Sequence, residues 1–459
     1  MLPNLKAKLQ EKLNSDAHFA ELVKGSGIAF VLRIFGIICG YIFTLLVTRT
    51  LGAKAWGIFA LCLVVLQIAS VIGRLGMDTA LLRFTAEYTA KGEIGILKEI
   101  YKKALILVVP FSILVAISVY FLSPILADKV FHKIYLTNYF HIISFVIVPF
   151  VLLWIHSESI RGFKKIKEYM LLQQSGIFFI AMLLFLVGLS FIKSHFLPII
   201  SYSISIIILT IISIYFWRKY LLLLLSLNSF TTSTPSTTFT TSKTFTTSIT
   251  YKSLLSVSIP MFLSSSLALI MGWTDTIMLG MFRSTQEVGI YNVVLRVSMI
   301  TSINLIAVNT IAAPKFAEFW GRGDIKKLAK VAHQSTKLIF WTSFPILLLF
   351  LTFPKPILGI FGEEFKTGSV ALVILCIGQV ISSLSGDAGG FLKMTNNQMF
   401  LQGLNFSAVL LNGLFNYILI PTYGVVGAAI VTIISLNIAK LIANIRIKKL
   451  YGFWLYISF

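Results

Sequence analysis

The chain has 459 residues, of which 57% are hydrophobic and only 12% are charged, and its mean hydropathy is +0.89. A soluble globular domain carries roughly 25% charged residues, so this composition excludes an ordinary water-soluble protein. The formal net charge of +22 could suggest nucleic-acid binding. Most Lys and Arg residues, however, lie in short segments between apolar runs, as the topology of a membrane protein requires, and we expect no nucleic-acid partner.

Apolar runs of about 20 residues are long enough to cross a hydrocarbon core of roughly 30 Å as helices. Lipid cannot satisfy free backbone groups and the alternating pattern of a membrane barrel is absent, so we predict an all-α integral membrane protein. The first segment, 1–26, is polar and amphipathic and is expected to lie on the cytoplasmic surface. Twelve spans are predicted near 27–48, 55–77, 102–122, 138–160, 170–192, 196–216, 255–281, 287–312, 331–352, 369–391, 400–420 and 424–446.

These spans divide into two six-helix halves, 27–222 and 253–459, around a segment of different composition at 223–252. Its central stretch SFTTSTPSTTFTTSKTFTTSIT, residues 229–250, has 16 Ser or Thr among 22 residues. Such a stretch can neither bury a core nor span a membrane, which predicts a flexible cytoplasmic linker. A phosphorylated regulatory segment is the alternative.

A repeated polar phrase supports the division into halves. RFTAEYTAKGE, residues 83–93, has a counterpart in KFAEFWGRGD, residues 315–324. Gly57-Ile-Phe corresponds to Gly289-Ile-Tyr 232 residues later, and Gly92-Glu corresponds to Gly323-Asp at a spacing of 231. An even number of spans leaves both halves in the same orientation, so we predict a parallel repeat about an axis along the membrane normal.

With both termini placed in the cytoplasm, most of the 39 Lys and Arg residues fall on the cytoplasmic side, as they do in multi-pass proteins of a cell membrane. The remaining basic excess would attract anionic membrane lipids. The three cysteines, Cys39, Cys62 and Cys376, all fall within spans and have no disulfide or metal-ligand spacing. We therefore expect neither a bound metal nor a cofactor.

Charged residues inside the spans are the candidate functional groups, because a charge at mid-bilayer costs roughly 2.5–3.5 kcal/mol on insertion scales. Arg33 and Arg296 lie deep within spans 1 and 8, and Asp275 lies about six residues from the outer end of span 7. An ion pair between Asp275 and Arg296 is one structural explanation of their similar depth. For Arg74, Asp78, Asp387 and Glu158, near inner ends, the alternative is a side chain that extends to the membrane surface.

Three stretches in order, LLVTRTLGAKAWGIFAL, GRLGMDTALLRFTAEY and WTDTIMLGMFRSTQEVGIYNVVLRV, resemble the oligosaccharide flippases and polysaccharide transporters. These belong to the multidrug/oligosaccharidyl-lipid/polysaccharide (MOP) exporter superfamily. The similarity extends to Tyr423-Gly424-Val-Val-Gly427 at the start of the last span and covers nearly the whole chain. The Ser/Thr-rich linker departs from the compact junction expected for this family.

The resemblance implies an alternating-access flippase whose two halves rock around a central cavity. It would move a lipid-linked oligosaccharide, carried on a polyprenyl phosphate or diphosphate, from the inner to the outer leaflet. Glycan-assembly enzymes would be its functional partners. For this substrate we expect Arg33 and Arg296, together with Arg74, to bind the diphosphate, because guanidinium stays charged and binds phosphate oxygens in a bidentate manner. A second hypothesis makes Asp275, or Asp78, a carboxylate that couples transport to a proton or sodium gradient or serves as a charge partner.

Three other functions would each require different sequence features. A multidrug or cation exporter of the same superfamily would favour acidic groups in its cavity. A flippase for the peptidoglycan lipid precursor would usually carry two further spans. An enzyme would need a catalytic constellation in a sizeable outer loop, and the longest predicted outer loop, 353–368, offers only Glu363 and Glu364. We therefore expect no catalytic residues and no enzymatic activity.

Overall fold

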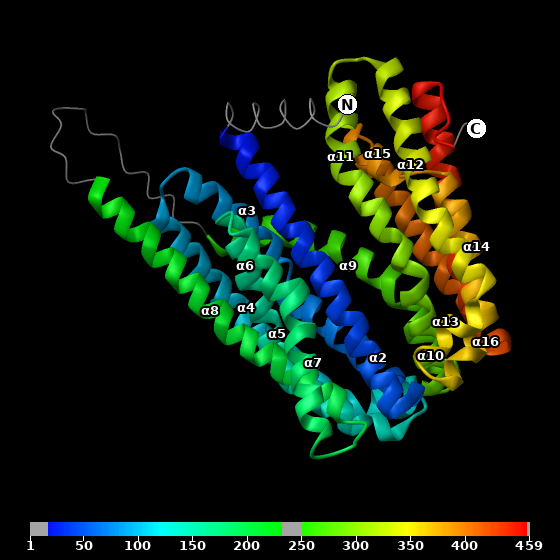
Figure 1. Ribbon diagram of the computed structural model, residues 1–459. Coiled ribbons are helices and arrows are strands. Elements are labelled where there is room, and N and C mark those ends of the chain that lie inside the picture. The colour runs from blue at the N-terminus through cyan, green and yellow to red at the C-terminus, as the bar shows by residue number, and fades with distance from the viewer. Residues whose placement is uncertain (1–16, 232–249, 457–459) are drawn as a thin grey trace, which may run out of the picture. The chain divides into compact units, whose positions relative to one another are not determined.

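The computed structural model describes residues 17–231 and 250–456, and it confirms the all-α prediction, since no described residue lies in a strand (Figure 1). The first half contains α2 (Ala17–Arg74), α3 (Met77–Ala90), α4 (Ile94–Ile125), η1 (Leu126–Val130), η2 (Ile134–Leu136), α5 (Thr137–Gly162), α6 (Ile166–Met170), η3 (Leu171–Ser175), α7 (Gly176–Leu189) and α8 (Leu197–Thr231). The second half contains α9 (Tyr251–Phe282), α10 (Thr285–Ser298), η4 (Met299–Thr301), α11 (Ser302–Gly321), α12 (Ile325–Thr352), α13 (Pro354–Gly359), η5 (Glu363–Gly368), α14 (Ser369–Leu384), α15 (Ala388–Met394) and α16 (Gln398–Tyr451).

Among the described residues, eight helices are long and apolar enough to cross a membrane, or up to nine if the bent α6–α7 pair forms one span. Two of the eight, of 46 and 54 residues, would measure about 70 and 80 Å, more than twice a hydrocarbon core. Each is bent at a glycine with non-helical angles, Gly52 in α2 (φ 82°) and Gly424 in α16 (φ 54°). Each of these two helices therefore supplies two predicted spans. The total of twelve stays a prediction.

The repeated phrases form the same helix–turn–helix junction in both halves. At the α3–α4 junction, the Gly92 N–H donates to Thr89 and the Glu93 N–H donates to Tyr88. At the α11–α12 junction, Gly323 donates to Trp320 and Asp324 to Phe319. Both glycines have positive φ, 73° and 69°, as a helix C-cap of this kind requires. The sequence repeat is thus a structural repeat of backbone hydrogen bonds.

The chain folds into two compact units that do not coincide with consecutive stretches of sequence. Unit 1 holds the described parts of Met1–Phe43, Val65–Leu126 and Tyr135–Ser266. Unit 2 holds Thr44–Val64, Ala127–Ile134 and the described part of Leu267–Phe459. Residues 44–64 and 127–134 of the first half therefore pack with the second half, and the first turns of α9 pack with the first half.

The predicted termini and linker lie partly outside the described residues. Of the expected cytoplasmic segment 1–26, the structure describes only the backbone from Ala17, which is already helical in α2. The expected linker 223–252 begins within α8, which continues to Thr231, and it ends within α9. The structure does not describe residues 232–249. The flexibility of the linker and its alternative role as a phosphorylated regulatory segment therefore stay predictions.

Within unit 1, Gly76 allows α9 to approach the junction between α2 and α3. Gly76 has φ 71°, and a Cβ placed on it would lie 2.2 Å from the Ser258 carbonyl oxygen and 2.7 Å from the Phe262 nitrogen. These are backbone atoms, which a side chain cannot displace without moving the helix. The first turns of α9 are thereby fixed against the first half.

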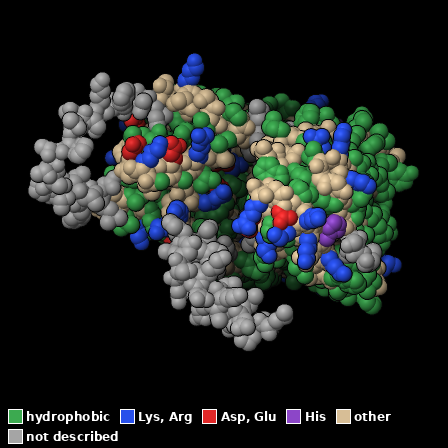
Figure 2. Space-filling view, turned by 90° about the horizontal axis from the view of Figure 1, so that it is seen from above, with side chains coloured by type: hydrophobic (Ala, Val, Ile, Leu, Met, Phe, Trp, Pro, Cys, Tyr) green, Lys and Arg blue, Asp and Glu red, His purple; other side chains and the backbone are tan. Residues whose placement is uncertain are grey.

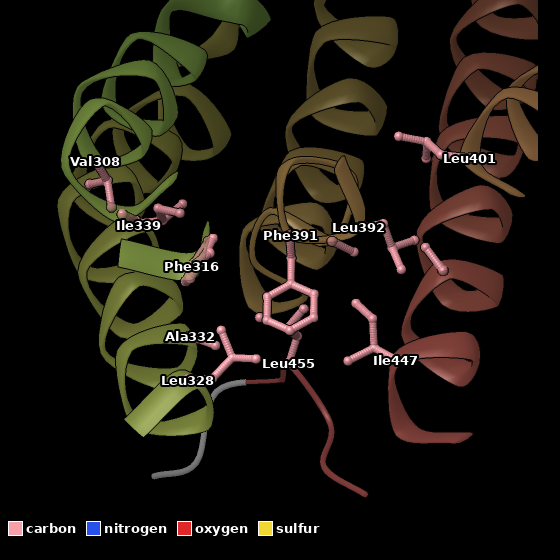
Figure 3. Packing of buried hydrophobic residues seen from close by; sticks show 13 residues of the cluster. Val308, Phe316, Leu328, Ala332, Ile339, Phe391, Leu392, Leu401, Ile447 and Leu455 are labelled. Atoms are coloured by element: carbon pink, nitrogen blue, oxygen red, sulfur yellow. The ribbon is translucent and has the colours of Figure 1, made fainter. Parts of the chain in front are cut away.

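Within unit 2, a cluster of apolar side chains joins α11, α12, α15 and α16 to the C-terminal segment (Figure 3). Helix α16 is followed by Gly452 with φ 82°, and the chain then turns back so that Leu455 is only 1% exposed. The Leu455 N–H donates to Asn444 Oδ1 at 3.2 Å. The C-terminal segment is therefore part of the core of unit 2.

Replacing Leu455 by alanine is expected to lower the free energy of unfolding by about 2–5 kcal/mol, because it leaves a cavity in this cluster. Thermal unfolding of the purified protein in detergent measures the change. Leu450→Ala is the matched control, since Leu450 is 43% exposed and its truncation should cost much less. Equal melting temperatures for the two variants would contradict the assigned packing of the C-terminal segment.

Candidate functional site

Arg296 lies near the end of α10, in unit 2. Helix α10 begins at the N-cap residue Ser284, whose Oγ accepts a hydrogen bond from the Glu287 N–H at 3.2 Å. Twelve residues later, Arg296 Nη1 donates to Thr44 Oγ1 at 3.0 Å. The guanidinium carbon lies 5.1 Å from the centroid of the Trp56 ring, a cation–π distance. The 44–64 segment thus supplies two fully buried side chains that orient this arginine.

Asp275, on α9 of unit 2, accepts hydrogen bonds from α10 and from the parts of α16 before and after its bend at Gly424. Its Oδ2 accepts from the hydroxyls of Tyr291 and Thr432, both at 2.6 Å. Its Oδ1 accepts from Asn416 Nδ2, also at 2.6 Å. The residue is 9% exposed, and no Lys, Arg or His nitrogen of the described chain lies within 4.0 Å of its carboxylate. Within the described chain, this buried carboxylate is thus stabilised by neutral hydrogen-bond donors.

The proposed ion pair between Asp275 and Arg296 is therefore wrong. Both residues are in unit 2, but Arg296 is directed to Thr44 and Trp56, whereas Asp275 is directed to the hydroxyl and amide donors. The i, i+4 pair Asn412 and Asn416 completes this polar group, with Asn416 Nδ2 donating to Asn412 Oδ1 at 3.0 Å. Two asparagines at this spacing in an apolar span are the sequence signal for such a buried polar group.

The charges near the ends of the spans in unit 1 are buried and paired instead of extending to the surface. Arg74 Nη1 and Asp78 Oδ2 are 3.0 Å apart, and the two residues are 5% and 9% exposed. The Arg74 guanidinium also lies 4.3 Å from the centroid of the Trp154 ring. Glu158 is 7% exposed and pairs with Arg161 at 3.1 Å. Burial of α5 between α3, α4 and α8 explains why these groups are not solvated.

Asp387 has a structural role at a helix start in unit 2. Its Oδ1 accepts from the Gly390 N–H at 3.0 Å and caps α15, and its Oδ2 accepts from Asn309 Nδ2 at 2.6 Å. Asp387 is half-buried, and its extension to the membrane surface stays a prediction beside this capping role.

The three candidate arginines are not brought together within one unit. Arg33 lies half-buried on α2 in unit 1, with no hydrogen bond or ion pair to any residue that the structure describes. Arg74 also lies in unit 1, where its guanidinium forms an ion pair with Asp78. Arg296 lies in unit 2.

Two glycines at equivalent positions of the repeat meet inside unit 2. A Cβ placed on Gly57 would lie 1.7 Å from the Thr285 carbonyl oxygen, and one placed on Gly289 would lie 2.0 Å from the Ala53 carbonyl oxygen. Gly57 and Gly289, like Ala53 and Thr285, are 232 residues apart. The contact is therefore a symmetric crossing of helices α2 and α10, which we call the glycine crossing.

Loops of both halves surround the glycine crossing. From the second half, Glu364 Oε1 accepts from the Ala53 N–H at 2.5 Å and Glu364 Oε2 accepts from Gln286 Nε2 at 2.9 Å. Arg49 donates to the carbonyl oxygens of Gly359 and Ile360. From the first half, Lys133 Nζ donates to the Gly280 carbonyl oxygen at 2.6 Å. Each half thus holds the first hairpin of the other by a polar contact.

The amino-acid sequence matches two family models. One is described as "Polysaccharide biosynthesis protein" and covers residues 22–320; the other, MatE, covers residues 260–418. The "Probable low-salt glycan biosynthesis flippase Agl15" of Haloferax volcanii is 29% identical over 164 residues, 36% of this chain and 35% of that protein. The "Probable flippase AglR" of the same organism is 26% identical over 182 residues, 39% of this chain and 38% of that protein. The matches thus span little more than a third of these relatives.

The fold is similar to a solved structure of the "Lipid II flippase MurJ, inward closed conformation", with a TM-score of 0.68. The superposition covers 93% of this chain and 87% of that chain at 16% sequence identity, so the likeness concerns the fold alone. The first family model covers well over half of the 459 residues. The chain therefore belongs to the polysaccharide biosynthesis protein family.

Proposed function

We propose that this multi-pass membrane protein moves a polyprenyl-phosphate- or diphosphate-linked oligosaccharide from the cytoplasmic to the outer leaflet of the cell membrane. The product would supply the assembly of a polysaccharide or another cell-surface glycan by partner enzymes. The observation that carries the proposal is the guanidinium of Arg296, held inside unit 2 by Thr44 and Trp56. A cation fixed at this depth suits an anionic substrate better than a cationic drug.

Arginine is suited to this role because its planar guanidinium presents parallel donors that match phosphate oxygens. In the proposal Arg296 and Arg33 attract the diphosphate, while the prenyl tail stays in lipid. Arg74 would join them only after its ion pair with Asp78 opens. Asp78 is accordingly the charge partner of Arg74.

Alternating access is supported by the glycine crossing. Residues 44–64 of the first half pack against α10 of the second half within unit 2. In the predicted topology this contact lies at the outer side, so release of the substrate to the outer leaflet requires the crossing to part. The polar contacts of Glu364, Arg49 and Lys133 would then break and re-form in every cycle.

The predicted orientation has support from the distribution of charge. Figure 2 shows Lys and Arg side chains gathered on the face seen from above, where the α11–α12 turn lies at the top of Figure 1. Basic residues favour the cytoplasmic side of a membrane. We therefore propose that the α11–α12 turn lies on the cytoplasmic side and that both termini are cytoplasmic, as the predicted topology requires.

Coupling to a proton or sodium gradient is assigned to Asp275. Its carboxylate accepts hydrogen bonds from the hydroxyls of Tyr291 and Thr432 and from the Asn416 amide, whose Oδ1 is buried without a hydrogen-bond partner in the described chain. Hydroxyl, carboxylate and amide oxygens are ligands for hard cations. A proton or a sodium ion that neutralised Asp275 would change the hydrogen bonds between α9, α10 and α16. Ion binding would in this way alter the packing of the helices that move during transport.

The second candidate function is export of cationic drugs, favoured by the MatE match over 260–418 and by the buried carboxylate of Asp275. The two functions differ in the charge of the substrate. A peptidoglycan-precursor flippase would share the anionic substrate class and differs in the glycan. Catalysis plays no part in the proposal.

Arg296→Ala is expected to slow transbilayer movement of a fluorescent diphosphate-linked oligosaccharide lipid roughly ten- to hundredfold in vesicles, since a charge-assisted hydrogen bond is worth about 1.5–3 kcal/mol. Arg296→Lys should be intermediate, because it keeps the charge and loses the bidentate geometry. Arg33→Ala is expected to act in the same direction.

Arg322→Ala is the matched control, because Arg322 is exposed and pairs with Glu318 outside the spans. Thr44→Val tests the alternative that Arg296 only anchors the 44–64 segment, since it removes the hydrogen bond and keeps the guanidinium. A normal flip rate in Arg296→Ala would refute the anion site. Efflux of a cationic dye with an immobile lipid substrate would instead establish the drug exporter.

A further inference from the structure

A groove between α4 and α8 in unit 1 has no part in the proposed transport mechanism. It has a volume of about 310 Å³, at the lower end of the range for small-molecule pockets. One side is formed by Lys98, Tyr101, Lys102, Leu105 and Ile106 of α4, and the other by Trp217 and Leu221 of α8. The α4 positions recur at intervals of three and four residues, which places them on one face of the helix.

This face of α4 is directed toward lipid. Only 17% of the most apolar window of the Ile94–Val130 segment is buried inside the protein. Ile106 in the groove is 50% exposed, and Leu222, next to the groove on α8, is 65% exposed. Because α4 starts at Ile94, Lys98 and Lys102 lie about 6 and 12 Å along the helix. The lysines are therefore at the depth of lipid headgroups, and the apolar residues are at the depth of acyl chains.

The floor of the groove is rigid and aromatic. The Tyr101 and Trp217 rings are stacked, with centroids 3.5 Å apart and planes inclined by 18°. The Tyr101 hydroxyl is hydrogen-bonded to His156 Nε2 at 2.6 Å, and His156 Nδ1 is 3.1 Å from Ser213 Oγ. Amphipathic aromatic rings favour the boundary between headgroups and hydrocarbon. The groove is thus preformed at that boundary.

The charge of the groove is positive and uncompensated. Lys103, which follows Lys102, pairs with Glu99 at 2.6 Å. Lys98 and Lys102 have no carboxylate oxygen within 4.0 Å among the residues that the structure describes. Arg218, next to Trp217, adds a third positive charge that acts on Tyr101 and His156. Two free ammonium groups above an apolar wall are complementary to an anionic headgroup with its acyl chain.

We propose that this groove binds an anionic phospholipid of the host membrane, distinct from the transported substrate. The phosphodiester would lie between the ammonium groups of Lys98 and Lys102. One acyl chain would follow Leu105, Ile106 and Leu221, and the headgroup edge would rest on the Tyr101–Trp217 stack. The bound lipid would join α4 to α8 at the membrane surface.

Photo-crosslinking in vesicles tests the proposal. The full-length protein is reconstituted in phosphatidylcholine with a small fraction of photoactivatable phosphatidylglycerol, and crosslinked peptides are identified by mass spectrometry. We expect adducts on the peptides of α4 and α8 that line the groove. Replacing Lys98 and Lys102 by glutamine should lower the yield about fivefold for each lysine removed, and the arginine substitutions should restore it.

Lys103→Gln is the matched control, since it removes the same charge from the neighbouring position on the same helix and should leave the yield unchanged. Equal labelling by photoactivatable phosphatidylcholine and phosphatidylglycerol, insensitive to the glutamine substitutions, would overturn the proposal. So would displacement of the phosphatidylglycerol adduct by an equimolar polyprenyl phosphate, which would assign the groove to the carrier lipid. Neither result depends on the flippase assay.

Discussion

Replacing Gly57 by alanine is expected to lower the rate of transport roughly five- to hundredfold, the largest effect predicted for a single methyl group in this protein. The new Cβ would lie 1.7 Å from the Thr285 carbonyl oxygen and 2.9 Å from the Gly289 nitrogen. Overpacking of this kind costs about 1–3 kcal/mol, which reduces the population of the closed crossing by the stated factor. Gly289→Ala should have a similar effect, because its Cβ would meet Ala53 in the same way.

The flip rate of the lipid-linked substrate measures the loss of transport, and labelling of an Ala53→Cys variant from the outer aqueous side measures the loss of closure. Ala53 is fully buried in the closed crossing, so labelling should increase when Gly57→Ala is added. Gly413→Ala is the matched control, since Gly413 lies within an apolar helix and no atom is within 4 Å of its added Cβ. Full activity and unchanged labelling in Gly57→Ala would show that the crossing does not limit transport.

Replacing Asp275 by asparagine is expected to abolish the dependence of transport on the ion gradient and to leave the fold intact. Asparagine has the same shape, and its oxygen can still accept from Tyr291 and Thr432. If the Asn416 amide rotates, its Oδ1, which is buried without a partner in the described chain, can accept from the new amide. We therefore expect a melting temperature equal to or above that of the wild-type protein.

Flip rates measured with and without proton and sodium gradients report the coupling. In the wild-type protein the gradient should accelerate transport, and in Asp275→Asn the two rates should be equal. Asp387→Asn is the control, because Asp387 is another acid of unit 2 and asparagine also caps helices well. Gradient-dependent transport in Asp275→Asn would assign coupling elsewhere, whatever happens to the Arg296 variants.

Membrane insertion, helical structure and the internal repeat could all be predicted from the sequence, because each depends on local patterns. Long apolar runs must be helical in lipid. The two repeated polar segments contain Gly92 and Gly323, whose positive φ favours a turn after a helix. Local patterns could not predict that α2 and α16 continue through the bends at Gly52 and Gly424. The positive φ at these glycines is compatible with a loop as well as with a bend.

The candidate charges could be located from the sequence, but their partners could not. Asp275 and Arg296 could be identified as candidates because a charged residue within a span is costly in lipid. Their similar depth in consecutive spans suggested an ion pair. The partners of Asp275 instead come from positions 16, 141 and 157 residues away. Which helix faces which side chain depends on the rotation of each helix about its axis, and hydropathy does not report this angle.

The sequence by itself determined the membrane environment, the duplicated scaffold and the residues with unusual charge, because these follow from composition and from similarity within the chain. Only the tertiary structure decided that Gly57 packs on Gly289 and that Asp275 is bound by hydroxyl and amide donors. It also decided that residues 44–64 pack with the opposite half. Such contacts join positions far apart in the chain, and their free energy comes from close packing and hydrogen-bond geometry that exist only once the helices are assembled.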